Sequence, residues 1–412
     1  MGKTANKKPR APRGGKKAGK RSGRKPTAAD RAGGKQAPEE QPVVFMASLG
    51  CAKNQVDSEQ LAAALAAEGF LLTAHPSDAD LALVNTCAFL KSAREETRGL
   101  LEELQGYKQR GRLKAVIAAG CYPAKTAKVP GADLALRFRD YPRLASVCRK
   151  ALGLRHRRRR APAPGVLSCA PRLRFGLKST AYLKIAEGCD NRCAYCTIPG
   201  IRGPLRSRPL AELVAEAHQL VADGAREIVV VAQDTAAYGH DLAGDRSTLA
   251  ELVRRLLEVP GYRWLRLMYA HPAHITDELI ELFLEEKLTD YLDMPIQHAD
   301  DGVLKTMGRG YGVDDLRRLI AKLRRASPRM ALRTTCIVGF PGETPAAFNR
   351  LRTFLVEARF DHLGAFVYSR EPGTRAARRK RQVSDRVRKR RWQQLMGLQK
   401  LIAGGRSMER VG

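Results

Sequence analysis

Six apolar runs alternate with amphipathic segments over residues 182–369. The runs are YLKIAEGC, EIVVVAQDT, WLRLMYAHP, YLDMPIQH, LRTTCIVGF and HLGAFVYS. Short runs that are apolar throughout indicate strands buried on both faces, and the intervening segments, such as LAELVAEAHQLVADG, have helical spacing. Six such units predict an α/β fold in which parallel strands form a partial (βα)6 TIM-type barrel with helices outside. Function is then expected at the carboxyl ends of the strands.

The first of these strands leads into a loop that contains Cys189, Cys193 and Cys196. Thiolates are preferred ligands of soft metals and iron–sulfur clusters, and the spacing C-x3-C-x2-C brings three sulfurs to one side of a compact cluster. No fourth cysteine is near, so one iron would keep an open position for chemistry. A zinc site that borrows a remote ligand such as His218, or three unligated thiols, are the alternative interpretations.

A second set of cysteines lies upstream, in three further strand–helix units. VVFMASLGC, DLALVNTC and AVIAAGC are apolar runs that end at Cys51, Cys87 and Cys121, and helical segments such as QVDSEQLAAALAAEGF follow. Parallel strands of an open α/β sheet direct their carboxyl ends to one edge, so these cysteines can converge. A single buried cysteine is usually a small hydrophobe. Here, however, a cysteine stands at the same place in three successive units. This recurrence predicts a second three-cysteine cluster in an N-terminal doubly wound parallel-sheet domain.

The pattern divides the chain into five predicted parts, which differ in charge, apolar content and regularity. They are a disordered basic tail at 1–41, an N-terminal domain with the second cysteine set at 42–150, a basic linker at 151–178, the barrel at 179–382 and a C-terminal helix at 383–412. From about residue 137 to 180 the regularity lapses, and the linker contains the run RHRRRR.

The formal net charge of +32 points to a polyanionic partner such as RNA or a ribonucleoprotein. Residues 1–41 carry 13 Lys or Arg against 3 acids, and residues 370–391 carry 11 against 2. One interpretation is that these basic segments contact RNA. For the N-terminal tail, the other interpretation is an extension that only increases solubility. No long apolar run or signal peptide is present, so we expect a cytoplasmic protein without a membrane segment.

The remaining cysteines and the histidines near strand ends are expected to have no role in the chemistry. Nine cysteines in a reducing compartment favour metal ligation over disulfides. Cys148 and Cys169 have no partner at ligand spacing, and Cys336 lies within a predicted strand. The histidines at strand ends, like the GRGYG segment, favour ordinary structural uses, namely hydrogen-bonded barrel side chains and a plain turn.

Several motifs together resemble the methylthiotransferase family of radical S-adenosylmethionine (SAM) enzymes. They are SLGCAKNQVDSE, VNTC, AGC, YLKIAEGCDNRCAYCTIPGIRG, QDTAAYG and GFPGET, and the match runs from about Val43 to the end. SLGCAKN, YLKIAEGC and QDTAAYG are most similar to the members that act on ribosomal protein S twelve. MGRGYG is similar to the sister enzymes that modify an adenosine of tRNA. Family members usually continue into a small β-barrel, the TRAM domain, so we expect this chain to be truncated before it.

The resemblance implies two 4Fe-4S clusters and SAM as cofactors. It assigns a radical SAM cluster to Cys189, Cys193 and Cys196, and an auxiliary cluster to Cys51, Cys87 and Cys121. The implied reaction begins with SAM cleavage to a 5′-deoxyadenosyl radical, which removes hydrogen from the β-carbon of one aspartate. Sulfur then comes from the auxiliary cluster and the methyl group from a second SAM.

The resemblance also implies partners and SAM contacts. The partners are ribosomal protein S twelve or the small ribosomal subunit, and an electron donor such as flavodoxin or ferredoxin. The tRNA reaction of the sister enzymes is the alternative. By position in the motifs, the candidate SAM contacts are Tyr195, Gln233 and Gly339.

Overall fold

The computed structural model describes residues 41–154, 171–242 and 247–409. The predicted basic tail lies outside the described residues except for its last position, and so do RHRRRR and Cys169. Within the described ranges, no helix is both long and apolar enough to cross a membrane.

The first sheet is parallel throughout and has the strand order β2-β1-β3-β4-β5. Its strands are β1 (Val43–Ser48), β2 (Leu71–Thr73), β3 (Leu81–Thr86), β4 (Ala115–Gly120) and β5 (Leu134–Leu136). The order reverses direction between β1 and β3, as it does in doubly wound sheets, and ligands bind such sheets at this switch point. The doubly wound N-terminal sheet predicted from the sequence is confirmed.

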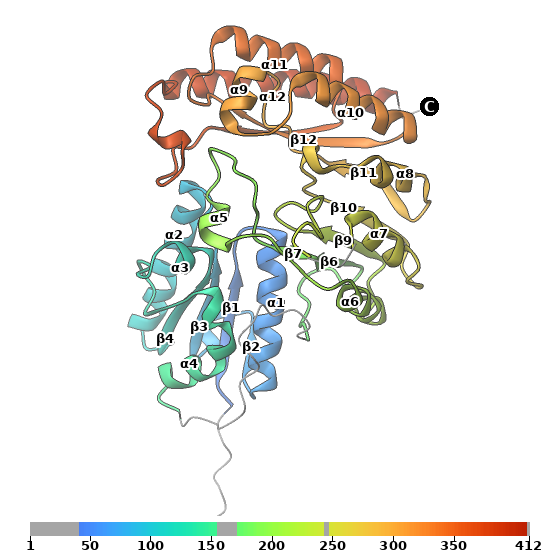
Figure 1. The fold of residues 1–412 in the computed structure, drawn as a ribbon. Helices are drawn as coiled ribbons and strands as arrows, with labels where there is room; N and C mark the ends of the chain where they lie inside the picture. The colour runs from blue at the N-terminus through green and yellow to red at the C-terminus, as the bar shows by residue number, and fades with distance from the viewer. Residues whose placement is uncertain (1–40, 155–170, 243–246, 410–412) are drawn as a thin grey trace, which may run out of the picture. The chain divides into compact units, whose positions relative to one another are not determined.

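Helices cover both faces of this sheet (Figure 1). They are α1 (Ala52–Ala67), α2 (Lys91–Gln109), α3 (Cys121–Lys125) and α4 (Leu144–Ala151). The side chains of β3 alternate between two cores, because Leu81 and Leu83 pack on the side of α1 and α4 whereas Ala82 and Val84 pack on the side of α2. All four are fully buried, as expected for a central strand of a doubly wound sheet.

Four elements in this region were not predicted: two strands, a 3-10 helix and an α-helix. The strands β2 and β5 have three residues each, which is too short for a period to be visible in the sequence. The expected lapse of regularity after residue 137 was wrong in its first part, because a 3-10 helix, η3 (Phe138–Arg143), leads directly into α4. Leu144 and Cys148 on α4 are buried against the sheet.

The second sheet contains the six predicted strands, all parallel, in the order β13-β12-β11-β10-β9-β6. They are β6 (Thr180–Lys184), β9 (Glu227–Val231), β10 (Trp264–Leu267), β11 (Leu288–Asp293), β12 (Ala331–Val338) and β13 (His362–Val367). β6 and β13 are not paired with each other, so the sheet is an open, partial barrel. The (βα)6 prediction is confirmed.

The helices between and after these strands supply one continuous core with them. They are α6 (Leu210–Ala222), α7 (Leu249–Leu257), α8 (Asp277–Glu281), α9 (Asp301–Met307), α10 (Val313–Ala326), α11 (Pro345–Ala358) and α12 (Asp385–Met408), with 3-10 turns η2 (Pro76–Asp78), η4 (Pro272–His274), η5 (Leu282–Leu284) and η6 (Ala376–Arg378) elsewhere. Thr248, Thr276, Asp300 and Thr344 begin four of these helices by accepting a backbone N–H with the side chain.

The loop after β6 is closed at its base by two short antiparallel strands, β7 (Ala186–Glu187) and β8 (Arg206–Ser207). The loop carries the C-x3-C-x2-C cysteines and then forms a short helix, α5 (Ile198–Arg202). Ile201 of α5 is buried in the core on the α2 side of the N-terminal sheet, and α5 lies against α3 (Figure 1). The cysteine loop of the barrel is therefore packed against the domain that carries the other cysteines.

Candidate functional site

A glycine with positive φ precedes three of the six candidate cluster cysteines. Gly50, Gly120 and Gly188 have φ of 97°, 89° and 80°, in the region that other residues rarely adopt. All three are also tightly packed, since a Cβ would lie 2.9 Å from Cys87 Cβ at Gly50, 2.2 Å from Asn85 Oδ1 at Gly120 and 1.9 Å from the carbonyl oxygen of Pro204 at Gly188. Each glycine turns the chain sharply between a strand and the cysteine that follows.

Cys51, Cys87 and Cys121 converge at the switch point of the N-terminal sheet. Cys87 directly follows β3, and its Sγ lies 3.1 Å from the Cβ position at Gly50. Burial raises the pKa of the Cys121 thiol to about 11, while the charge of Arg202 opposes this shift and those of Cys87 and Cys51 add to it. Gly50, which precedes Cys51, contacts both Cys87 and Asn54, and Asn54 in turn contacts Cys121, so the three cysteines lie together at one edge of the sheet. The convergence predicted from the sequence agrees with this geometry.

Cys189, Cys193 and Cys196 form the second group, in the loop after β6. Burial raises the pKa of the Cys196 thiol to about 12, and the charges of Cys193 and Cys189 add to the shift. Arg309 donates to Cys193 Sγ at 3.3 Å. Burial raises the pKa of the Cys189 thiol, and hydrogen bonds from the backbone and side chain of Asn191, which lies between Cys189 and Cys193, oppose this shift. Donors to the sulfurs are already in place for thiolate ligands.

In the described part of the chain, neither cysteine group has the close spacing of ligands around one zinc ion. Three thiolates around one zinc are about 3.8 Å apart, because each Zn–S bond is about 2.3 Å. Among the described residues, three ligand atoms lie within 4.8 Å of one another only at Asp234, His271 and His274, and neither cysteine group is so tight. His218 is exposed on α6. The zinc alternative has no support in this geometry.

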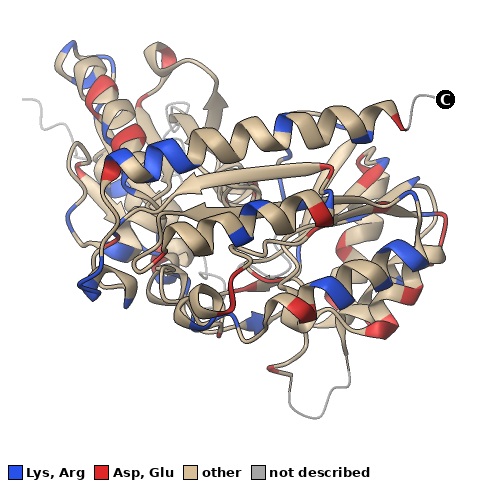
Figure 2. Ribbon diagram, turned by 90° about the horizontal axis from the view of Figure 1, so that it is seen from above, with Lys and Arg blue, Asp and Glu red and all other residues tan. Residues whose placement is uncertain are grey.

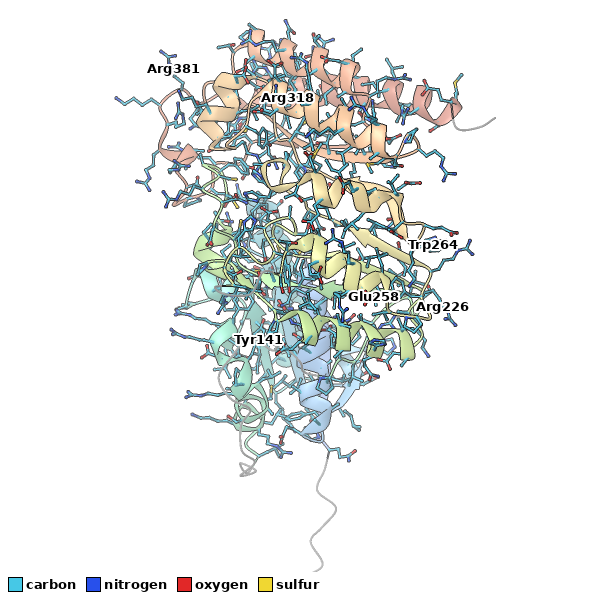
Figure 3. All side chains as sticks on the ribbon, turned by 45° about the vertical axis from the view of Figure 1, so that its right-hand side comes forward. Tyr141, Arg226, Glu258, Trp264, Arg318 and Arg381 are labelled. Carbon is cyan, nitrogen blue, oxygen red and sulfur yellow. The ribbon has the colours of Figure 1, made fainter. Side chains whose placement is uncertain are left out.

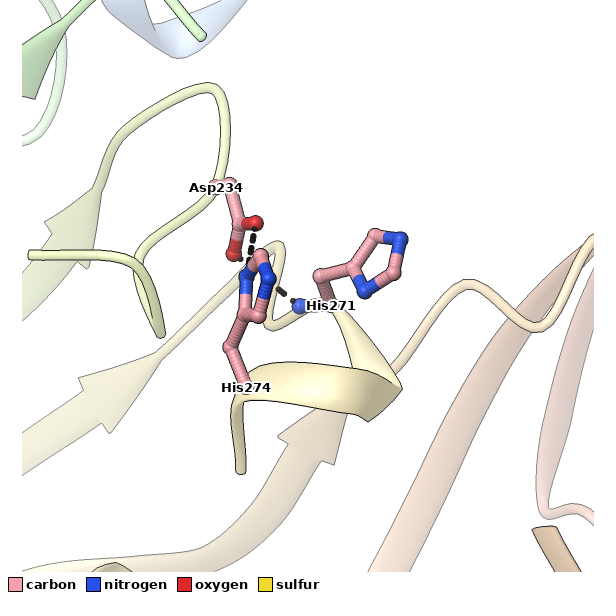
Figure 4. Close-up of side chains that lie close together, drawn as sticks. All are labelled: Asp234, His271 and His274. Carbon is pink, nitrogen blue, oxygen red and sulfur yellow. Dashed lines mark hydrogen bonds and ion pairs between the residues drawn. The ribbon is translucent and has the colours of Figure 1, made fainter. Parts of the chain in front are cut away.

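Hydrogen bonds explain the close approach of Asp234, His271 and His274 (Figure 4). Asp234 Oδ2 accepts from Asn191 Nδ2 at 2.7 Å and lies 2.8 Å from His274 Nδ1, and its Oδ1 accepts the backbone N–H of His271. Burial and the charge of Arg309 lower the pKa of His271 to about 3, so this imidazole is neutral. The trio links the ends of β9 and β10 to the cysteine loop through Asn191.

A buried network of charges joins α1, the β6–β7 segment and α5. Lys184 donates to Asp57 and, at 3.0 Å, to Glu187. Arg202 donates to Asp57 at 2.9 Å and to Glu187 at 2.8 Å. Burial opposes ionisation of Glu187, but the charges of Arg202 and Lys184 outweigh it and lower its pKa to about 2. Two acids and two bases therefore neutralise one another beneath the cysteine sites.

Lys53 and Tyr269 connect the N-terminal cysteines with the barrel. Lys53 Nζ lies 3.6 Å from the centroid of the Tyr269 ring, just beyond the end of β10. Burial raises the pKa of Tyr269 to about 12, and the charges of Cys51 and Asp293 add to the shift. Tyr269 and Gln297 have φ of 64° and 67°, a strain that proteins retain mainly at functional positions. The Cys51 side of the N-terminal site thus faces the carboxyl ends of the barrel strands.

Polar atoms without partners surround the same strand ends. Four buried atoms have no hydrogen-bond partner among the described residues: Gln233 Oε1, His271 Nε2, Asp293 Oδ1 and Gln297 Oε1. Buried polar groups are nearly always paired, so such a cluster indicates a polar ligand. The amino-acid and ribose groups of SAM offer suitable hydrogen-bond partners for these four atoms.

The three candidate SAM contacts have different surroundings. The Tyr195 hydroxyl lies 3.3 Å from Arg309 Nη1 beside the cysteine loop, and Gln233 Nε2 donates to Glu187 at 3.0 Å. A Cβ at Gly339 would lie 2.0 Å from Cγ of Arg388 on α12, so the approach of that side chain accounts for the glycine. Contact of these residues with SAM stays a prediction.

Several residues expected to have ordinary structural uses have them, but the plain-turn prediction for GRGYG was wrong for Arg309, which donates to Cys193 Sγ. Cys336 and Cys148 are fully buried in the two cores. His298 Nε2 lies 3.1 Å from Glu343 Oε1. In GRGYG, Gly308 ends α9 with a left-handed conformation, and the segment is a turn.

Sequence reasoning missed the charged residues around the cysteines, above all Arg202, Asp57 and Arg309. One signal was available, since Lys184 and Glu187 interrupt an apolar strand in YLKIAEGC and a charge there requires a buried partner. The partners of these charges lie far apart in the chain and depend on the packing of α1 and α5 against the barrel.

Comparisons with known proteins agree with this geometry. Residues 183–355 match the Radical SAM superfamily, and residues 43–132 match Uncharacterized protein family UPF0004. The "Ribosomal protein uS12 methylthiotransferase RimO" of Pelobacter propionicus is 43% identical over 377 residues, which cover 90% of this chain and 84% of that protein. Those of Trichlorobacter lovleyi and Geobacter sulfurreducens are each 44% identical, over 90% and 87% of this chain and 84% and 82% of those proteins.

Solved structures share the fold at low sequence identity. The radical SAM methyltransferase TsrM from Kitasatospora setae, described with cobalamin and a 4Fe-4S cluster, has a TM-score of 0.59 and 17% identity over 82% of this chain and 77% of its own. The cobalamin-dependent SAM radical enzyme OxsB has a TM-score of 0.54 and 10% identity over 88% and 56%. The identity to the relatives above, over most of both chains, shows that this protein belongs to the RimO family of radical SAM methylthiotransferases.

Proposed function

We propose that the chain inserts sulfur and a methyl group at the β-carbon of an aspartate in ribosomal protein uS12. The relatives that are 43–44% identical carry this substrate in their names. The observation that supports the proposal is the contact between the two cysteine-bearing parts: Arg202, in the loop of Cys189, donates to Cys121 Sγ at 3.4 Å, and Lys53, two residues after Cys51, lies 3.6 Å from the ring of Tyr269. A methylthio group needs both a radical and a source of sulfur within reach of one substrate carbon.

The cysteines divide this chemistry between two sites. We assign one 4Fe-4S cluster to Cys189, Cys193 and Cys196, and one to Cys51, Cys87 and Cys121. With SAM bound, the cluster at Cys189, Cys193 and Cys196 would supply a carbon radical able to remove an unactivated hydrogen. The cluster at Cys51, Cys87 and Cys121 would supply sulfur. The side chains hold these groups: glycine turns aim the cysteines, and donors such as Arg309 and Asn191 stabilise their thiolates.

Residues at the strand ends position the remaining ligands. The unpaired atoms of Gln233 and Gln297 would accept or donate hydrogen bonds to SAM or to the substrate aspartate. We retain Tyr195, Gln233 and Gly339 as proposed SAM contacts on the strength of their motifs. His271, as a neutral imidazole, adds no positive charge to that of Arg309 beside the cysteine loop.

The domain boundaries and the compartment are further parts of the proposal. The matched regions 43–132 and 183–355 fall within the proposed domains 42–150 and 179–382. A ribosomal substrate supports a cytoplasmic location. The need for one electron in each SAM cleavage supports an electron donor such as flavodoxin or ferredoxin.

An exposed basic surface supports contact with RNA of the small subunit. It comprises Arg375, Arg378, Arg379, Lys380, Arg381, Arg386, Lys389 and Arg390, all exposed. Basic residues line the first turns of α12 (Figure 2), and Arg381 lies on an outer loop (Figure 3). Each phosphate that such residues neutralise releases counterions, so binding should weaken steeply with salt.

This docking proposal predicts a change in salt dependence. Replacing Arg386, Lys389 and Arg390 by serine should flatten the slope of log affinity against log salt by up to about 3, since each lost phosphate contact removes about 0.9. The measurement is a salt titration of binding to small ribosomal subunits. Serine at Arg255 and Arg318, which are exposed elsewhere on the barrel, is the control. An equal slope for the α12 variant and wild type would refute docking through this surface.

The substrate is tested by offering both candidates to the reduced enzyme. Small ribosomal subunits and tRNA are incubated separately with reconstituted protein, SAM and dithionite, and the products are examined by mass spectrometry of uS12 peptides and of nucleosides. The proposal expects methylthio-aspartate in uS12 and unmodified tRNA. Methylthio-adenosine with unmodified uS12 would instead establish the tRNA alternative.

A further inference from the structure

Arg202 connects the two cysteine sites. It is the last residue of α5, only six positions after Cys196, so it belongs to the loop of the radical SAM cysteines. Its neighbour Ile201 is buried in the core of the N-terminal domain. The side chain of Arg202 is 2% exposed and lies 4.4 Å from the centroid of the Phe138 ring. A guanidinium that is this deeply buried needs hydrogen-bond acceptors within the protein, because water cannot supply them.

The two terminal nitrogens of the guanidinium donate to four residues. Nη1 donates to Asp57 at 2.9 Å and to Glu187 at 2.8 Å. Nη2 donates to Asn54 Oδ1 and, at 3.4 Å, to Cys121 Sγ. Two acids hold one side of the fork, and the other side is directed at a cysteine of the N-terminal site. Lysine cannot reproduce this arrangement, because its ammonium has three donors and no fixed plane.

Asn54 fixes the second side of the fork. Its Nδ2 donates to the carbonyl oxygens of Leu49 and Thr86 at 2.9 and 3.0 Å, which orients Oδ1 toward Arg202. The Cys121 thiol lies 3.6 Å from the same Oδ1 and donates to it. As a metal ligand, Cys121 would be a thiolate without a proton and could no longer donate to Asn54. Arg202 would still donate to the sulfur of Cys121.

We propose that Arg202 is a positioning residue that tunes the auxiliary cluster through Cys121 and raises its reduction potential. The inference rests on the proposed assignment of Cys51, Cys87 and Cys121 as ligands. Reduction adds one electron, and part of the added charge falls on the ligand sulfurs. A cationic donor at 3.4 Å stabilises this reduced state more than the oxidised state. The loop that carries one cluster thereby sets the electron affinity of the other.

The test uses the full chain with Cys189, Cys193 and Cys196 changed to Ala, so that only the auxiliary cluster remains. Into this chain are introduced Arg202→Gln, which keeps a neutral donor, and Arg202→Lys, which keeps the charge. Arg208→Met is the matched control, because Arg208 is also buried and paired with an acid, Glu216, yet contacts no cysteine. Each protein is reconstituted anaerobically and titrated with dithionite, which supplies the electron, while the reduced cluster is followed by electron paramagnetic resonance.

We expect Arg202→Gln to lower the reduction equilibrium constant about tenfold, equivalent to about 59 mV for a one-electron couple. Arg202→Lys should give a smaller decrease, and Arg208→Met should match the parent. If Arg202→Gln does not fold, by circular dichroism, Arg202→Lys decides. A potential equal to the parent's in the folded Arg202 variants, or an equal decrease in Arg208→Met, would overturn the inference. A parent chain that binds no 4Fe-4S cluster would instead refute the ligand assignment itself.

Discussion

Replacing Gly188 by alanine should remove the radical SAM cluster and leave the auxiliary one. The new Cβ would lie 1.9 Å from the carbonyl oxygen of Pro204, and real Cβ atoms stay beyond 3.0 Å, so the base of the cysteine loop must open by about 1.1 Å. Alanine at a φ of 80° costs about 1 kcal/mol, and overpacking adds about 1–3 kcal/mol. The displacement falls directly on Cys189.

The assay is iron and sulfide content after anaerobic reconstitution, together with 5′-deoxyadenosine formed from SAM under dithionite. Gly188→Ala should retain about half of the iron and form no 5′-deoxyadenosine, because a displaced thiolate no longer completes its three-cysteine set. Gly200→Ala is the control in the same loop, since a Cβ there meets nothing within 4 Å and its φ is not positive. Full iron content and full SAM cleavage in Gly188→Ala would refute the role given to the glycine turn.

Two further predictions concern other parts of the site. Gly120→Ala places a Cβ 2.2 Å from Asn85 Oδ1, so this variant should lose the iron of the auxiliary cluster and still form 5′-deoxyadenosine. The same assays measure both quantities. Loss of SAM cleavage with the iron retained would contradict this prediction. His271 has a pKa of about 3 when folded and about 6.5 when unfolded, so the unfolded state binds a proton more readily. The free energy of unfolding is therefore highest above pH 6.5 and decreases progressively as pH falls toward 3. Between pH 6.5 and 5.0 the free energy of unfolding in urea should therefore fall by about 2 kcal/mol more in wild type than in His271→Gln. The exposed His218→Gln should behave as wild type, and parallel curves for wild type and His271→Gln would contradict the burial argument.

The larger elements of the fold could be predicted from the sequence because their signals are local. β3 is apolar on both faces, and the six barrel strands each carry enough apolar residues to be distinguished from the helices between them. The strands β2 and β5 could not be predicted, since three residues at a sheet edge leave no period. The helix α4 was missed because regularity was expected to lapse after about residue 137, and eight residues carry only one short set of apolar positions at helical spacing, Leu144, Val147 and Cys148.

The candidate site shows the same division between local and distant information. Cys51, Cys87 and Cys121 could be grouped because each follows a strand, and the topology of parallel sheets brings such positions together. The partners of Arg202 are set by the packing of α1 and α5, which no local pattern encodes. The glycine before Cys189 was visible in the sequence, but its need for positive φ appeared only with the fold.

The central claim is that two three-cysteine clusters divide radical formation from sulfur delivery. The most direct measurement compares wild type with the variant in which Cys51, Cys87 and Cys121 are changed to Ala, each reconstituted with ⁵⁷Fe and examined by Mössbauer spectroscopy and product analysis. Two 4Fe-4S clusters in wild type are expected to become one in the variant, which should still form 5′-deoxyadenosine but yield no methylthiolated uS12. A variant that retains two clusters, or that still methylthiolates uS12, would contradict the division of roles.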